Sequence, residues 1–174
     1  MLAVGTSVRI VLAPVVMALV LHGSDTEAAI VFLVAATTDW FDGRLARRWG
    51  VTTRLGGFLD TTADKLLVSV ALIALVDVGR VSPWLAALIV SRELVLLGLR
   101  AAVAAEGRDV VVSMLGKWKA TIQFVAIALA IIRPDVKIAG VFLDQWAMLI
   151  ATVVTLWSGY DYLARYLSAL RTSE

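Results

Sequence analysis

Long apolar segments separated by short polar breaks cover almost all of the 174-residue chain. A membrane-spanning helix needs about 20 mostly apolar residues, and six segments approach that length. They run roughly over residues 3–21, 27–42, 59–76, 83–105, 115–132 and 138–156. The last is predicted to continue as an interfacial helix towards Leu170. No segment alternates as a strand would, so the pattern predicts an all-α protein with six transmembrane helices.

The breaks carry turn and charge signals. Pro83 and Pro134 suit the ends of helices because proline has no backbone N–H. The longest break, over residues 43–57, is rich in arginine and glycine. Nothing resembles a linker or an internal repeat, and residues 1–174 are therefore expected to form one membrane domain.

The composition supports a location in the membrane. Hydrophobic residues make up 60% of the chain and charged residues 17%, with a mean hydropathy of +0.88. A soluble domain is usually about half apolar and a quarter charged, and a small one could not hide so much apolar surface. The absence of Cys excludes disulfides and thiolate metal sites, and a single His excludes a multi-histidine site. A net charge of +2 does not suggest a nucleic-acid partner.

Basic residues are distributed unequally between the two sets of breaks. One set carries only Arg80, Arg133 and Lys137. The other carries Arg44, Arg47, Arg48, Arg54, Arg100, Arg108, Lys117, Lys119, Arg165 and Arg171. Basic loops stay in the cytoplasm, so both termini and the 43–57 break are predicted to be cytoplasmic. Residues 1–22 are predicted to be a span and not a signal peptide, because no A-x-A-like cleavage site follows them.

Four aspartates lie at the cytoplasmic ends of the second and third segments. Asp39 and Asp42 close the second segment, and Asp60 and Asp64 open the third. Spacings of three and four residues put each pair on one helix face. Because the connection between the segments is short, the two helices are expected to be antiparallel neighbours. Their four carboxylates would then converge near the membrane boundary.

Four neighbouring carboxylates repel one another strongly where the dielectric is low. They must be protonated, paired with basic groups or bound to cations. Oxygen ligands without Cys or His favour Mg²⁺, Mn²⁺ or Ca²⁺, and four carboxylates could hold two ions. Two other interpretations are helix ends among solvated headgroups and a divalent-cation transporter. A transporter would have acids deeper in other spans, where only Glu93 is found.

The residues around these aspartates form a signature. Asp39-Trp-Phe-Asp42-Gly43-Arg-Leu-Ala46-Arg47 is followed by Gly56, Asp60 and Asp64, which matches D-x2-D-G-x2-A-R-x8-G-x3-D-x3-D in full. The chain therefore resembles the CDP-alcohol phosphatidyltransferase family of membrane enzymes. The resemblance implies that a hydroxyl acceptor attacks the lipid-side phosphorus of CDP-diacylglycerol and that CMP leaves.

The resemblance also implies roles for the matching residues. Asp39, Asp42, Asp60 and Asp64 would share two divalent ions, Mg²⁺ or Mn²⁺, and Asp64 would take the proton of the acceptor. The residues expected to bind the CDP-lipid are Asp42, Gly43, Ala46, Arg47 and Gly56. The two glycines would let the nucleotide approach the backbone closely, and the arginine can grip phosphate through two N–H groups. A homodimer in the inner membrane, with its active site facing the cytoplasm, is also implied.

A second set of residues concerns the acceptor. Ser91-Arg92-Glu93 to Leu99-Arg100, and the run from Gly116 to Gln123, look like the bacterial phosphatidylglycerophosphate synthase branch of that family, which uses sn-glycerol 3-phosphate. The resemblance implies a cationic pocket for the acceptor phosphate formed by Arg92, Arg100, Lys117 and Lys119.

Some positions depart from that branch. Thr61 stands where a Pro is frequent, Ala120 replaces a common Thr, and Ala3 replaces a usual Asn. These differences concern the acceptor and not the chemistry. Inositol phosphate, or phosphatidylglycerol in cardiolipin synthesis, therefore stay open as other acceptors.

Overall fold

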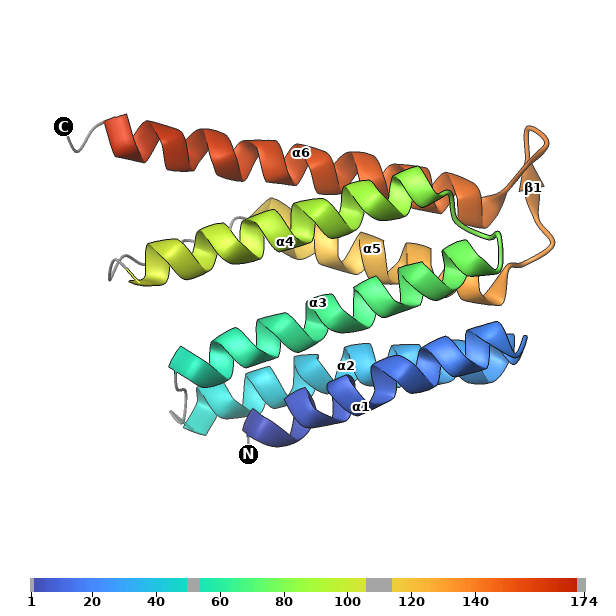
Figure 1. The fold of residues 1–174 in the computed structure, drawn as a ribbon, viewed down its shortest axis with the longest axis horizontal. Helices are drawn as coiled ribbons and strands as arrows, with labels where there is room; N and C mark the ends of the chain where they lie inside the picture. Colours follow the sequence, from blue (N-terminus) through green and yellow to red (C-terminus); the bar gives the residue numbers. More distant parts are fainter. Residues whose placement is uncertain (1, 50–53, 106–113, 172–174) are drawn as a thin grey trace.

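Six α-helices follow one another along the described part of the chain (Figure 1). The computed structural model describes the backbone of residues 2–49, 54–105 and 114–171 and the side chains of residues 5–38, 56–105 and 118–164. The helices are α1 (Leu2–Leu21), α2 (Asp25–Trp49), α3 (Arg54–Asp77), α4 (Pro83–Ala105), α5 (Met114–Ile132) and α6 (Leu143–Arg171). Six helices and an all-α class were predicted, and the structure confirms both.

Three helix ends differ clearly from the prediction. Helix α2 continues to Trp49 and α3 begins at Arg54, so most of the predicted 43–57 break is helical. The last helix begins at Leu143, five residues beyond the predicted start, and it does extend past Leu170. Some glycines in the break lie within these helices and do not end them, because tertiary packing readily overrides helix propensity.

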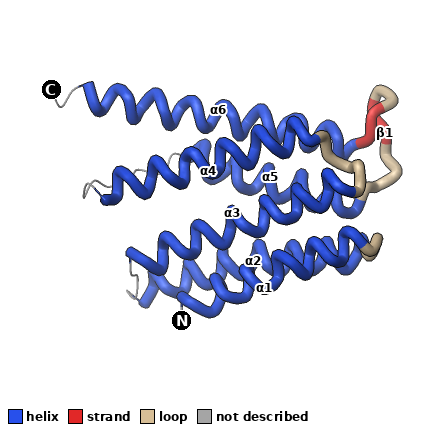
Figure 2. The backbone as a smooth tube through the Cα atoms, viewed as in Figure 1, coloured by secondary structure: helices blue, strands red, loops and turns tan. Residues whose placement is uncertain are grey.

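The structure adds one feature that the sequence pattern did not indicate. A short hairpin, β1 (Lys137–Ile138) and β2 (Val141–Phe142), precedes α6 (Figure 2). Its two central residues, Ala139 and Gly140, both have positive φ angles, of 53° and 80°. This is the conformation of a two-residue hairpin turn, in which glycine is the favoured second residue. Two-residue strands are too short to show an alternating pattern.

Helix ends at one end of the bundle follow from local sequence. Helix α1 ends before Gly23, which has a φ of 75°, and Ser24 donates its N–H to the carbonyl of Leu19. This glycine cap satisfies carbonyls that the helix leaves without partners. Pro83 opens α4 at the first helical position, where the missing N–H costs nothing. The same end is tied together by Arg80, which bonds Asp25 at 2.7 Å and the carbonyl of Ile131.

Helix α1 is the central partner in its half of the bundle. It packs along both α2 and α3, whereas α2 and α3 contact each other only slightly in the described part of the chain. The direct packing of these two helices that the short connection predicted is therefore largely replaced by packing through α1. In the other half, α4 packs against α3 and α6, and α5 packs against α2 and α6. The start of α1 and the end of α6 lie at the same end of the bundle (Figure 1).

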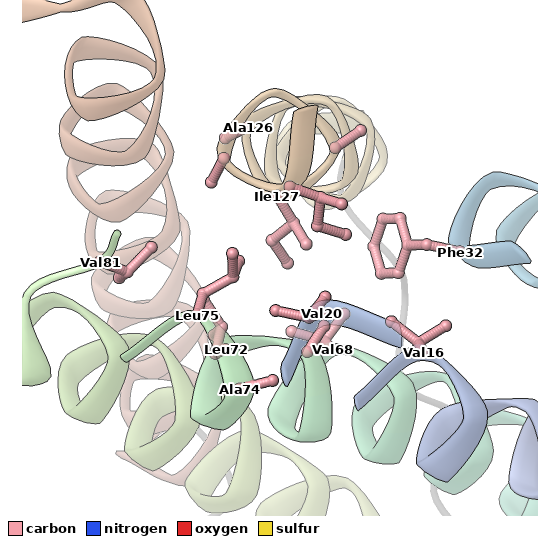
Figure 3. Close-up of a cluster of buried hydrophobic side chains, with 14 of the residues drawn as sticks. Val16, Val20, Phe32, Val68, Leu72, Ala74, Leu75, Val81, Ala126 and Ile127 are labelled. Carbon is pink, nitrogen blue, oxygen red and sulfur yellow. The ribbon is translucent and has the colours of Figure 1, made fainter. Parts of the chain in front are cut away.

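A continuous apolar core joins the two halves (Figure 3). Val16 and Val20 of α1, Phe32 of α2, Leu72 of α3 and Ile127 of α5 meet there, each at most 1% exposed. Phe32 also packs at a tilt against Phe124, with 5.7 Å between ring centroids. Interdigitated side chains of this kind hold the helices in a fixed register, which positions the polar groups described below.

Apolar side chains also cover the outside of the bundle. Every helix presents at least one large exposed apolar residue, among them Val11, Ile30, Ile73, Leu94, Val125 and Val153. Large exposed apolar side chains on all six helices are typical of a protein that contacts lipid. By length and composition, Leu143–Ala164 is the one stretch among the described residues that could cross a membrane, and Gly5–Leu21 and Trp118–Ile132 are shorter apolar helices.

Candidate active site

Asp60 and Asp64 lie one turn apart near the start of α3. Both side chains are partly exposed, at 30% and 19%. Each has one carboxylate oxygen held by a basic residue, Arg9 in the case of Asp60 and Lys65 in the case of Asp64. The two predicted acids of the third helix are therefore on one face and can be reached by a ligand.

Arg9 of α1 holds Asp60 in place. Its side chain is 1% exposed, and its guanidinium donates to Asp60 Oδ1 and lies 3.3 Å from the backbone carbonyl oxygen of Asp60. The hydroxyl of Thr6, one turn earlier on α1, lies 3.4 Å from the same Oδ1. A guanidinium that bonds both the carboxylate and the backbone of one residue restricts the rotamer of that residue. The close packing of α1 on α3 makes this contact.

The carboxylate oxygens of these two aspartates are suitable ligands for a hard divalent cation. Asp60 Oδ2 and Asp64 Oδ1 accept no hydrogen bond among the described residues. They are carboxylate oxygens on one helix face, and oxygen ligands are those that Mg²⁺ and Mn²⁺ prefer. Two carboxylates alone make an incomplete site, and the described residues contain no cluster of three or more acidic, His or Cys side chains. Asp39 and Asp42 are the predicted remaining ligands.

A second polar group lies deeper in the bundle and is centred on Glu93 of α4. We define the Glu93 cluster as Lys65, Arg92, Glu93, Lys119 and Ser158, which come from four helices. Glu93 is 2% exposed; its Oε1 accepts from Lys119 and, at 3.0 Å, from Arg92, while its Oε2 lies 2.8 Å from Lys65. One buried carboxylate thus holds three cations, which compensates for its loss of hydration.

Lys65 connects this cluster to the acids of α3. Its Nζ lies 3.2 Å from Asp64 Oδ2 and 2.8 Å from Glu93 Oε2. The predicted proton acceptor and the predicted cationic pocket are therefore adjacent in space, although Asp64 and Glu93 are on different helices.

The side chain of Arg92 packs against helix α6. The hydroxyl of Ser158 accepts a hydrogen bond from Arg92 Nη2 at 3.0 Å. A Cβ placed on the next residue, Gly159, would lie 3.1 Å from Arg92 Nε and 3.2 Å from its Cγ. Glycine is therefore the residue that leaves room for this guanidinium. The guanidinium of Arg100 lies over the ring of Tyr162, also on α6, at 5.3 Å from its centroid.

The structure brings together part of the predicted acceptor pocket. Arg92 and Lys119 both contact Glu93, whereas the contact that the structure gives for Arg100 is with Tyr162. Gly56 lies near the start of α3, on the same helix as the two aspartates. The predicted residues whose side chains fall outside the described set are Asp39, Asp42, Gly43, Ala46, Arg47 and Lys117, which lie on α2 and α5.

Several residues of these two groups were not singled out as site residues from the sequence. Arg9 and Lys65 are basic residues inside apolar segments, and such residues usually face a partner or a cavity. That signal could have identified them. Consecutive residues such as Arg92 and Glu93 project about 100° apart round a helix, yet these two side chains meet. Nothing in the sequence distinguishes Ser158 and Gly159.

Comparison with known proteins identifies the class of enzyme. The family model for CDP-alcohol phosphatidyltransferase matches residues 3–157, and the chain therefore belongs to the CDP-alcohol phosphatidyltransferase family. The chain is thus a transferase, and the family generally uses divalent metal ions.

Two relatives are similar over most of their length. A CDP-diacylglycerol–glycerol-3-phosphate 3-phosphatidyltransferase of Escherichia coli (strain K12) is 43% identical over 169 residues, which cover 91% of this chain and 90% of the relative. The Bacillus subtilis (strain 168) protein of the same name is 40% identical over 148 residues, which cover 84% of this chain and 76% of the relative.

Proposed function

We propose that this protein transfers the phosphatidyl group of CDP-diacylglycerol to sn-glycerol 3-phosphate and releases CMP. The product would be phosphatidylglycerophosphate, a precursor in phospholipid synthesis. The observation that carries the proposal is the contact between Lys65 and Asp64, which joins an accessible pair of carboxylates to a buried group of cations. The names of the relatives, at 40–43% identity, support the same donor and acceptor.

The geometry suits a small, phosphorylated alcohol. Such an acceptor carries a hydroxyl, which needs a base, and a phosphate, which needs cations. Asp64 is accessible and can accept a hydrogen bond from the hydroxyl, as a general base requires. Arg92, Arg100, Lys117 and Lys119 are proposed to attract the phosphate. A neutral alcohol would gain nothing from these charges.

In the proposed reaction, the acceptor hydroxyl oxygen forms a bond to the phosphorus that carries diacylglycerol. Asp64 takes the hydroxyl proton, and the bond between that phosphorus and the oxygen of CMP breaks, so that CMP leaves with the electron pair. Arg9 keeps Asp60 in a fixed rotamer throughout. Direct attack by the acceptor hydroxyl is the proposed course, and it needs no nucleophile from the protein and no covalent intermediate.

Asp39, Asp42, Asp60 and Asp64 are proposed to hold two divalent ions, Mg²⁺ or Mn²⁺. Bound there, such ions would neutralise the pyrophosphate of the donor and stabilise charge on the leaving phosphate. Asp42, Gly43, Ala46, Arg47 and Gly56 are proposed to bind the CDP-lipid. The assignment of the metal site is supported by the carboxylate oxygens of Asp60 and Asp64, one on each residue, that accept no hydrogen bond among the described residues.

We further propose that all six helices cross a bacterial inner membrane, with both termini and the active site on the cytoplasmic side. The apolar outer surface supports this arrangement, as does the excess of basic residues near the end where α1 begins. The whole chain would form one membrane domain, and a homodimer is the proposed assembly.

The test is CMP release by the purified full-length protein with CDP-diacylglycerol, Mg²⁺ or Mn²⁺, and a panel of acceptors. We expect release with sn-glycerol 3-phosphate, and much less with inositol phosphate or phosphatidylglycerol. Chelation by EDTA should stop the reaction, and Asp64→Asn should abolish it in a protein that still elutes as a folded species. Release with another acceptor but not with glycerol 3-phosphate would refute the proposed substrate.

A further inference from the structure

The cations of the Glu93 cluster differ in how far a ligand can reach them. The side chain of Lys119 is 3% exposed, like that of Glu93 at 2%, whereas Lys65 is 17% and Arg92 11% exposed. Lys119 and Glu93 therefore form an inner ion pair, and Lys65 and Arg92 form the side of the cluster that opens outwards. An anion entering from solution would meet these two cations first.

Lys65, the most exposed cation of the cluster, also has an unused donor. An ammonium group has three N–H bonds. Lys65 has two carboxylate partners for them, Asp64 and Glu93. No third acceptor for Lys65 occurs within the part of the chain that is described. Two carboxylates, on α3 and α4, thus hold the ammonium in place and leave one N–H for a ligand.

We propose that Lys65 binds the phosphate of the acceptor, together with Arg92. This inference rests on the proposed function and adds a residue to its acceptor pocket. A three-carbon acceptor is short, so a phosphate at Lys65 places the hydroxyl of the same molecule close to Asp64, the neighbour of Lys65 in sequence and in space. Glu93 then holds Lys65 and Arg92 in position, and Lys119, buried beside Glu93, adds its positive charge to the acceptor pocket without contacting the phosphate.

A competing role for Lys65 is purely local. It could orient Asp64 without touching the acceptor, and its loss would then lower kcat and leave the KM for the acceptor unchanged. Loss of a phosphate ligand has the opposite signature, because it removes binding energy for one substrate. The two roles are therefore separated by measuring both kinetic constants for both substrates.

The experiment compares wild type, Lys65→Met and Lys65→Arg in CMP release, with sn-glycerol 3-phosphate and CDP-diacylglycerol varied in turn. Lys137→Met is the matched control, since Lys137 is exposed in β1 at the far end of the bundle. We expect Lys65→Met to raise the KM for glycerol 3-phosphate about tenfold, or about 1.4 kcal/mol. The KM for CDP-diacylglycerol and kcat should change less than about threefold, and Lys65→Arg should fall between wild type and Lys65→Met.

Each other outcome overturns the inference. A fall in kcat with an unchanged KM for glycerol 3-phosphate would show that Lys65 acts only through Asp64. Equal changes in both KM values would show a general loss of structure. If Lys65→Met does not accumulate as a folded protein, an unchanged acceptor KM in Lys65→Arg refutes the assignment. If wild type releases CMP only with other acceptors, the proposed function fails first and the inference fails with it.

Discussion

Replacing Glu93 by Gln should destabilise this protein far more than the loss of an ordinary ion pair. Glu93 is the only anion in the Glu93 cluster, and it faces Lys65, Arg92 and Lys119. The substitution preserves size and removes the charge. It therefore leaves the ammonium of Lys119, which is 3% exposed, without its counterion.

The structure sets the scale of the effect. Removing one partner of a buried ion pair typically costs about 3–5 kcal/mol, because the other charge stays buried and uncompensated. Lys65 and Arg92 retain some access to water and keep Asp64 and Ser158 as partners. We therefore expect a loss of about 3 kcal/mol, at the lower end of that range. The partly buried pair of Arg80 and Asp25 provides the comparison, since its side chains are 14% and 30% exposed and its loss leaves no fully buried charge without a counterion.

The free energy of unfolding can be measured in mixed micelles by tryptophan fluorescence, for Glu93→Gln and for Asp25→Asn. A double variant, Glu93→Gln with Lys119→Met, should recover part of the lost stability because it removes the buried charge as well. Equal and small losses in both single variants would refute the conclusion that Glu93 compensates buried cations. The conclusion would also be refuted if the double variant lost as much stability as Glu93→Gln and Lys119→Met lose when measured separately and added.

Two further substitutions test the positioning of site residues. Arg9→Met should lower kcat for CMP release by about 10- to 100-fold by freeing the Asp60 rotamer, while Arg133→Met, at the opposite end, should not; an unchanged kcat in Arg9→Met would argue against this role. Gly159→Ala should raise the KM for glycerol 3-phosphate by displacing Arg92, whereas Gly98→Ala, where a Cβ has nothing within 4 Å, should leave it unchanged. Similar KM values in these two glycine variants would remove Gly159 from the acceptor site.

Much of the architecture could be predicted from the sequence. Long apolar runs determine six helices, since only a helix satisfies its own backbone in an apolar environment. The signature from Asp39 to Asp64 determines the enzyme family, because its spacing is local. Helix limits were less predictable: α2 and α3 extend into the 43–57 break, and a hairpin precedes α6. The glycine and arginine residues of a break do not indicate whether tertiary packing will keep that segment helical.

Only the tertiary structure decided which charges meet. Periodicity specifies the face of a helix on which a residue lies, but not the neighbouring helix that this face contacts. The pairing of Arg9 with Asp60 follows from the packing of α1 on α3. Lys65 reaches both Asp64 and Glu93 because α3 and α4 are adjacent, and Lys119 reaches Glu93 from α5. These contacts join residues far apart in the chain, and they depend on the shape of the whole apolar core.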